Sequence, residues 1–231
     1  RRRDALRHAA AQLQLRSEAL INLLGAECGK PLRDARVEVA RLIETFEIAA
    51  AESLNLTGEV LDLSHSPRAA GTRGLTRRVP VGPCSFFTPF NFPLNLCAHK
   101  VAPALAAGCP FILKPSERTP LSALAIGAAL ADAGLPPGAF SVLPCALEHI
   151  APLVEDPRLA LFSFTGSPEV GWSLRARAGK KRVTLELGGN AACVIDADQH
   201  LLRLPTDLIA LIFSLVAALT TKTVSRSLSA A

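Results

Sequence analysis

The first fifty residues alternate polar and apolar positions with the period of an amphipathic helix. Residues 4–24 place Leu and Ala at helical spacing between charges, and 25–30 contain the glycines that end such a run. Residues 34–54 repeat the pattern, with one apolar stripe formed by Val37, Ala40, Ile43, Phe46 and Ala50. This spacing is typical of helices that bury one face. We therefore expect residues 1–56 to form an antiparallel helical pair that serves as a packing scaffold.

A loop or hairpin is expected next, because residues 57–74 are rich in Ser, Gly, Pro and charge. Residues 75–81 fit an edge strand that Pro80 ends. From Cys84 onward, short apolar runs alternate with helical segments. The pattern predicts strands at 84–88, 111–114, 140–143, 161–165 and 183–187, and helices at 94–107, 120–133, 147–154 and from Pro168. This alternation with short connections predicts an α/β fold, a parallel sheet with helices on both faces, preceded by the helical pair.

Polar residues that break the helical pattern follow four of the predicted strands, at 89–91, 114–117, 165–167 and 186–189. Ligands of parallel sheets bind at the carboxyl ends of the strands, so these segments should line one rim. Ser167 is the expected N-cap of the helix that Pro168 begins, and the free amides of that helix suit an anion. Glu186, at the end of the next strand, is a carboxylate suited to moving protons. The sequence contains no G-x-G-x-x-G fingerprint for a dinucleotide.

The composition indicates a soluble globular protein. Of 231 residues, 49% are hydrophobic and 19% charged, with a net charge of +5. Basic residues gather at 1–3 and 175–182, but there are no tyrosines and only one tryptophan to interleave with them. We therefore expect a solvated basic face and no nucleic-acid partner, with a basic RNA-binding module as the less favoured alternative.

The six cysteines form no CxxC pair, which favours reduced thiols in a reducing compartment and a cytoplasmic location. The N-terminus has no apolar segment of the kind found in signal peptides, and residue 1 is not Met, which fits a fragment. The apolar run at 208–219 is too short to span a bilayer, so no membrane association is expected. No spacing of His, Cys, Asp and Glu predicts a metal site.

Four motifs occur in a fixed order: PFNFP at 89–93, LKPSERTP at 113–120, FTGSPEVG at 164–171 and LELGGNAA at 185–192. Together they resemble the NAD(P)-dependent aldehyde dehydrogenase superfamily, over about residues 4–198. The GLTRRVPVGP run before the first motif resembles the branch that acts on lactaldehyde- and glyceraldehyde-type substrates. The resemblance implies an incomplete Rossmann-like NAD-binding domain at 57–198, followed by a divergent tail at 199–231.

The resemblance also implies roles for single residues. Asn91 would donate its amide to the oxyanion that forms from the aldehyde, and Glu186 would be the general base. The cofactor would be bound by Thr88, Pro89, Lys114, Ser116, Glu117, Gly166, Ser167 and Leu187. A carboxylate at Glu117 binds ribose hydroxyls and repels a 2'-phosphate, so NAD is favoured over NADP. From the residues alone, Asn91 could equally be a turn residue, Ser167 a simple N-cap and Glu186 a surface acid.

The chain departs from the family at the nucleophile. The family's cysteine lies roughly three dozen residues beyond the general base, which falls near Thr220, and no cysteine follows Cys193. Cys193 follows Glu186 by seven residues in a strand-like run that points into the core. Threonine is a poor substitute, because its hydroxyl is far less ionised than a thiol. We therefore expect a truncated, inactive aldehyde dehydrogenase. The alternative is a non-catalytic remnant that binds NAD or a partner such as a full-length homologue.

Overall fold

The N-terminal region consists of three helices, where the sequence predicts two. The computed structural model describes residues 1–189, and these begin with α1 (Arg2–Leu15), α2 (Ser17–Cys28) and α3 (Leu32–Glu52). The helical run is interrupted at Arg16, whose backbone N–H donates to the carbonyl oxygens of Gln12 and Leu13 at 3.3 and 3.2 Å. The single helix predicted at 4–24 is therefore wrong. The apolar positions on both sides of the break continue one helical period, so the pattern carries no sign of it.

The buried face of α3 is rotated from the predicted stripe. Ile43, Phe46 and Ala50 are buried as expected, but Val37 is 57% exposed and Ala40 is also exposed. The buried residues of this helix are Ala35, Glu38, Val39, Leu42, Ile43, Phe46, Ala49 and Ala50. The predicted stripe steps by three residues from Val37 to Phe46 and so drifts around a helix of 3.6 residues per turn, whereas the buried face follows Val39, Leu42, Phe46 and Ala49.

A two-stranded antiparallel hairpin follows the helices. Strand β1 (Val60–Asp62) pairs with β2 (Arg73–Leu75), and a short 3-10 helix, η1 (Pro67–Ala69), lies between them. Of the two structures expected for 57–74, the hairpin is therefore correct. The edge strand expected at 75–81 is wrong, because the strand ends at Leu75. Pro80 and Pro83 in the following segment lack the N–H groups that a ladder needs.

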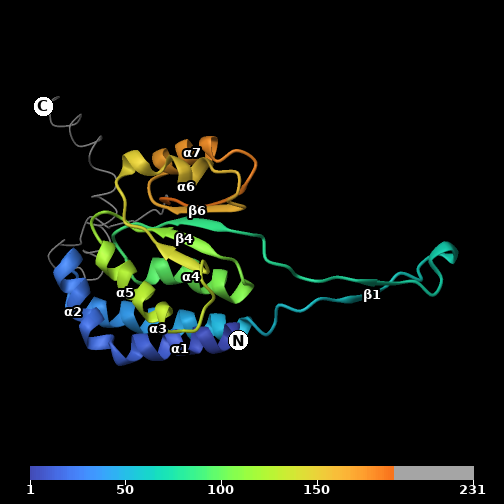
Figure 1. The fold of residues 1–231 in the computed structure, drawn as a ribbon, viewed down its shortest axis with the longest axis horizontal. Helices are drawn as coiled ribbons and strands as arrows, with labels where there is room; N and C mark the ends of the chain where they lie inside the picture. The colour runs from blue at the N-terminus through green and yellow to red at the C-terminus, as the bar shows by residue number, and fades with distance from the viewer. Residues whose placement is uncertain (190–231) are drawn as a thin grey trace, which may run out of the picture. The chain divides into compact units, whose positions relative to one another are not determined.

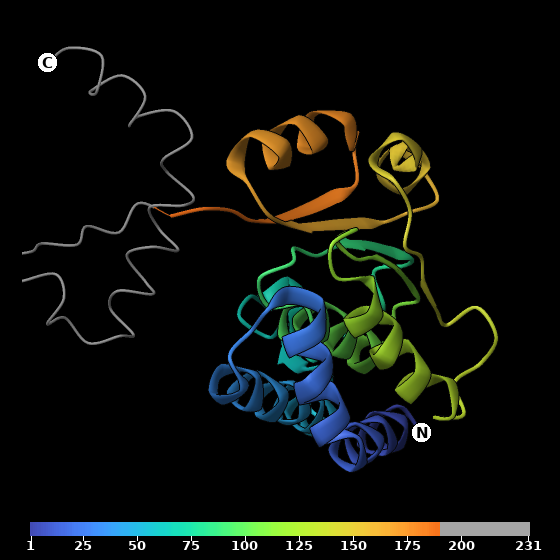
Figure 2. The same cartoon turned by 90° about the vertical axis from the view of Figure 1, so that its left-hand side faces the viewer.

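Five parallel strands form the main sheet of the described residues, in the order β5-β4-β3-β6-β7. They are β3 (Cys84–Phe87), β4 (Phe111–Lys114), β5 (Phe140–Val142), β6 (Leu161–Thr165) and β7 (Arg182–Glu186). The later helices are α4 (Asn95–Ala107), α5 (Pro120–Ala131), η2 (Leu147–His149), α6 (Ala151–Glu155) and α7 (Pro168–Arg177). Helices α1 to α5 cover one face and α6 and α7 the other, as Figures 1 and 2 show. This confirms the predicted α/β architecture, although the helix expected at 147–154 is split into η2 and α6.

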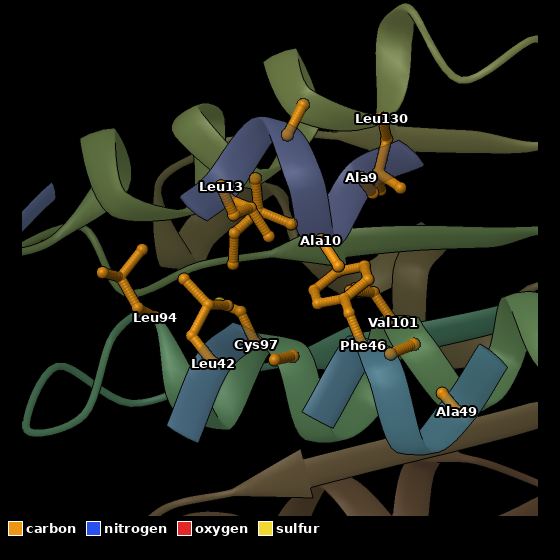
Figure 3. Close-up of a cluster of buried hydrophobic side chains, with 14 of the residues drawn as sticks. Ala9, Ala10, Leu13, Leu42, Phe46, Ala49, Leu94, Cys97, Val101 and Leu130 are labelled. Atoms are coloured by element: carbon orange, nitrogen blue, oxygen red, sulfur yellow. The ribbon is translucent and has the colours of Figure 1, made fainter. Parts of the chain in front are cut away.

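Two hydrophobic cores hold the sheet between its helical layers. Figure 3 shows part of the first, where Leu13, Phe46, Val101 and Leu130 come from α1, α3, α4 and α5. The second lies under α6 and α7, where the rings of Phe87 and Phe162 meet edge to face at 5.2 Å. Residues 1–188 form one compact unit, and the three-part division made from the sequence stays a prediction. None of the described helices is both long and apolar enough to cross a membrane.

Candidate active site

The strand order reverses between β3 and β6, which makes this the topological switch point of the sheet. The chain steps from β3 to β4 and β5 on one side, and then returns to add β6 and β7 on the other. The parallel register aligns Phe87 with both Lys114 and Phe164, and Thr165 with Glu186. The four polar segments predicted from the sequence therefore follow strand ends that lie along one rim, where parallel sheets bind ligands.

The turn after β6 is joined directly to the end of β7. The backbone N–H of Gly166 donates to the carbonyl oxygen of Glu186 at 3.0 Å. Ser167 then takes the N-cap position of α7, with extended backbone angles, and Pro168 is the first helical residue. The Ser167 hydroxyl makes no capping hydrogen bond to α7 in the described chain. Both the hydroxyl and the first amides of the helix thus face the rim without being used by the helix itself.

Two glycines allow α7 to lie close against the sheet. A Cβ at Gly166 would lie 2.5 Å from Cζ of Phe164, and a Cβ at Gly171 would lie 2.4 Å from Cδ2 of Leu187. Any larger residue would have to displace the Phe164 or Leu187 side chain or push the helix away from the sheet. Leu187 therefore acts as the surface on which the first turn of α7 rests. This close packing fits the approach of a phosphate group to the helix amides.

The segment after β4 forms a tight polar turn at the same rim. Lys114 is buried, and its Nζ lies 3.6 Å from Oε1 of the half-exposed Glu117. The Ser116 hydroxyl accepts a hydrogen bond from the Arg118 N–H at 3.2 Å, and the Thr88 N–H donates to the Lys114 carbonyl at 3.2 Å. The segment is therefore a structural turn that also presents an ammonium and a carboxylate.

Asn91 lies in the exposed loop between β3 and α4, directly after Pro89 and Phe90. Its Oδ1 accepts a hydrogen bond from the Phe92 N–H at 3.2 Å, and its backbone oxygen accepts one from Lys30 Nζ at 2.8 Å. Within the described residues, Asn91 is not among those that line the cavity containing Glu186. The two residues thus share a rim, but Asn91 lies outside the cavity that Glu186 lines.

A buried ion pair that the sequence did not reveal anchors this loop. Glu38, 1% exposed, accepts hydrogen bonds at Oε1 from the backbone N–H groups of Leu94 at 2.9 Å and Asn95 at 3.1 Å. Its Oε2 is paired with Lys30, whose Nζ also lies 3.9 Å above the Phe92 ring. Glu38 thereby stabilises the amino terminus of α4, where backbone amides would otherwise be unsatisfied. In the sequence, the signal for a buried Glu38 is an acidic residue within an apolar helical stripe.

A second missed residue, Lys100, lines the same cavity as Glu186. Both line a cavity of about 590 Å³ between α4 and strands β6 and β7, with Thr165 and Leu187 on the same wall. Lys100 is 9% exposed, and its Nζ donates to Ser163 Oγ at 2.7 Å. Burial lowers the Lys100 pKa to about 8, against the opposing effect of the Glu186 carboxylate. The sequence signal was a lysine within an apolar helical run.

The aldehyde dehydrogenase family model matches residues 1–215 of the chain. The chain belongs to the aldehyde dehydrogenase family. The match continues beyond residue 198, where the resemblance was expected to end.

The relatives are aldehyde dehydrogenases of more than twice the length. A 3-sulfolactaldehyde dehydrogenase from Priestia aryabhattai is 40% identical over 87% of this chain and 42% of its own length. A succinate-semialdehyde dehydrogenase from Paenarthrobacter nicotinovorans is 39% identical over 87% and 44%. The crystal structure of aldehyde dehydrogenase 21 from Physcomitrella patens, in complex with the reaction product succinate, superposes with a TM-score of 0.82. The aligned region is 48% identical and covers 92% of this chain and 44% of the Physcomitrella patens chain.

Two buried cysteines of this chain, Cys84 and Cys97, have strongly raised thiol pKa values. Burial raises the Cys97 pKa to about 12, although a contact with Thr88 Oγ1 at 3.2 Å works against the shift. Burial and the neighbouring Cys109 raise the Cys84 pKa to about 12 as well. Because the thiolate is the nucleophilic form, neither residue is reactive at neutral pH. Cys193 and Thr220 lie outside the described residues, and no metal-binding cluster of His, Cys, Asp and Glu occurs within 1–189.

Proposed function

We propose that this chain is the cofactor-binding part of an aldehyde dehydrogenase that oxidises an aldehyde to a carboxylic acid with NAD. On its own, the 231-residue chain binds NAD and does not turn over aldehyde. The observation that carries the proposal is the hydrogen bond from the Gly166 N–H to the Glu186 carbonyl. It places a carboxylate-bearing residue beside the amino terminus of α7, the two features that a dinucleotide enzyme needs at one rim.

The residues at the rim fit NAD by their chemistry. The Ser167 hydroxyl and the first α7 amides hold the pyrophosphate, and Gly166 and Gly171 keep the helix close. Lys114 and Glu117 bind the adenosine ribose hydroxyls, and Pro89 and Ser116 contribute to the same cofactor surface. Thr88, which is buried, and Leu187, which packs against α7, contribute by supporting that surface. When bound, NAD supplies the acceptor for the hydride. The carboxylate of Glu117 disfavours a 2'-phosphate, so NAD is preferred to NADP.

Glu186 and Asn91 serve the aldehyde in this proposal. The Glu186 carboxylate takes a proton from the nucleophile or from the hydrolytic water, and the Asn91 amide donates to the aldehyde oxygen as its negative charge develops. The loop that carries Asn91 is held by Lys30 and Glu38. Asn91 lies outside the cavity that Glu186 lines, so the remaining length of a full enzyme would have to complete the site between them.

The nucleophile is the missing component. A thiolate must attack the aldehyde before hydride transfer, and no cysteine follows Cys193 in the sequence. Cys84 and Cys97 do not replace it, because their raised pKa values keep both thiols protonated. The names of the relatives, 3-sulfolactaldehyde and succinate-semialdehyde dehydrogenase, favour a short aldehyde that carries an acidic group as the substrate of the intact enzyme.

Calorimetry and an NADH assay on the same purified chain test the proposal. We expect saturable NAD binding that the Ser167→Pro variant weakens, and no NADH from short aldehydes. The variant Thr220→Cys supplies sulfur at the counted position and belongs in the same assay. Absence of NAD binding in a folded chain would overturn the proposed cofactor role. NADH formation by the unmodified chain would overturn the proposed inactivity.

A further inference from the structure

Lys100 combines burial with access to a cavity. Its side chain comes from α4 and ends at Ser163 Oγ on β6, 2.7 Å from Nζ, while only 9% of the residue is exposed. The cavity it lines has a volume of about 590 Å³, within the range of small-molecule sites. Lysines are rarely buried to this degree unless a partner compensates their charge. Here the direct partner is a neutral hydroxyl.

Burial leaves a fraction of the Lys100 side chains uncharged near neutral pH. Burial lowers its pKa to about 8, while Glu186 on β7 and Cys97 on α4 act in the opposite direction. His99, the neighbouring residue on α4, also has a lowered pKa, chiefly through burial. With a pKa of about 8, about a tenth of the Lys100 side chains carry a free amine at pH 7, against about one in three thousand for an ordinary lysine. A desolvated lysine amine is a nucleophile for carbonyl compounds.

The cavity provides an apolar wall and a proton carrier for such a reaction. Leu96, Pro103 and Leu161 are among its apolar lining, and Glu186 and Thr165 lie at the rim end of the same lining. An aldehyde of a few carbons fits this volume with its chain against the apolar wall. The carboxylate can then exchange protons with the reacting oxygen and nitrogen.

We propose that Lys100 forms a Schiff base with short neutral aldehydes in this cavity, with Glu186 moving the protons. The free amine attacks the carbonyl carbon, a C–N bond forms, and the carbonyl oxygen takes a proton to give a carbinolamine. The nitrogen then loses its remaining proton as water leaves, which yields the C=N bond. One aldehyde and one amine give one imine and one water, so no oxidant is consumed. The reaction needs neither NAD nor a thiol, and therefore does not depend on the proposed dehydrogenase role.

Reductive trapping tests this proposal on the whole 231-residue chain. The protein is incubated with propanal and sodium cyanoborohydride at pH 7, and the propylated lysines are mapped by peptide mass spectrometry. We expect Lys100 to be propylated at least about tenfold faster than the exposed Lys180, because of its larger free-amine fraction. The rate at Lys100 should level off above pH 8. Equal rates at Lys100 and Lys180 would overturn the proposal, and this comparison needs no variant that could fail to fold.

Two variants separate the roles of the residues. Lys100→Arg keeps the positive charge and a donor for Ser163 but removes the amine, so trapping at this position should be lost while labelling of Lys180 continues. Glu186→Gln keeps the side-chain shape and should slow trapping at Lys100 several-fold. An unchanged rate in Glu186→Gln would disprove the proton-transfer role. NAD calorimetry on the same samples reports the dehydrogenase proposal independently, so failure of one cannot be mistaken for failure of the other.

Discussion

The Glu38 carboxylate on α3 accepts a hydrogen bond from the Leu94 backbone N–H at 2.9 Å and thereby joins the N-terminal helices to the loop that carries Asn91. Glu38→Ala leaves Lys30 without its buried partner and the first amides of α4 unsatisfied. We expect the free energy of unfolding to fall by about 3–5 kcal/mol, as is typical when one partner of a buried ion pair is removed. Urea denaturation measures the change.

The matched control is Glu44→Ala, an exposed acid on the same helix. It should change the free energy of unfolding by less than about 0.5 kcal/mol. Similar denaturation midpoints for the two variants would show that the Glu38 network contributes no special stability.

The close approach of Gly171 to Leu187 predicts that a larger residue at position 171 destabilises the fold. In Gly171→Ala the new Cβ would lie 2.4 Å from Leu187 Cδ2 and 3.3 Å from Phe164 Cδ1, so the Leu187 side chain or α7 itself must move. Overpacking of this kind destabilises by about 1–3 kcal/mol. Displacement of α7 would move its first amides, so NAD affinity should fall as well. Thermal unfolding and calorimetry measure the two effects.

Gly25→Ala in α2 is the control for this substitution. The nearest atom to its added Cβ is a backbone oxygen at 3.8 Å, so nothing has to move. Alanine is the better helix former by about 1 kcal/mol, so the control should unfold at the same or a higher temperature. A Gly171→Ala protein as stable as Gly25→Ala would contradict the close packing of α7.

The local sequence pattern was sufficient to predict the strands and the helix start that form the rim. Strands β3, β4 and β6 and the start of helix α7 were predicted to within about a residue, because each is marked by a short apolar run or by Gly, Pro or a capping residue. The register then follows from parallel topology. Glu186 and Thr165 fall opposite each other because both strands start at the same level of the sheet.

The residues that were missed are charged groups whose partners are distant in sequence. Glu38 pairs with amides 56 and 57 positions away, and Lys100 with a hydroxyl 63 positions away. A hydrophobic period treats such side chains as exposed, because a buried charge becomes favourable only when the fold brings its partner to it. The break at Arg16 was missed for a related reason, since an unbroken apolar period spans it.

The carboxylate of Glu117 leads to a prediction on cofactor preference that rests on the proposed function. We expect the chain to bind NAD more tightly than NADP by at least about tenfold, since a 2'-phosphate placed near a carboxylate is repelled. Glu117→Gln removes the charge and keeps the shape, so the ratio of the two affinities should shrink. Glu148→Gln, an exposed acid in η2, should leave the ratio unchanged. An unchanged ratio of NAD to NADP affinity in Glu117→Gln would show that the adenosine ribose does not bind near Glu117.

The buried Lys100 makes stability depend on pH in a direction that can be stated in advance. Its pKa is about 8 in the folded chain against 10.5 ordinarily, so between these values the unfolded chain binds more protons. The penalty of burying the charge is therefore fully present below pH 8 and is relieved as pH rises, at up to roughly 1.4 kcal/mol per unit. Lys100→Met removes this dependence, so the parent minus variant unfolding free energy should increase from pH 8 to 9.5. Between pH 6 and 7 the difference should change less, through His99, whose pKa the Lys100 charge lowers. The Lys100 charge lowers the Cys97 pKa, so Lys100→Met raises it further. With pKa values of about 12, Cys84 and Cys97 stay protonated in both folded proteins up to pH 9.5, so their contribution cancels in the difference. Urea denaturation at each pH gives the two curves, with Lys180→Met as the exposed control. Parallel curves for the parent and Lys100→Met would mean that Lys100 keeps its ordinary protonation inside the fold.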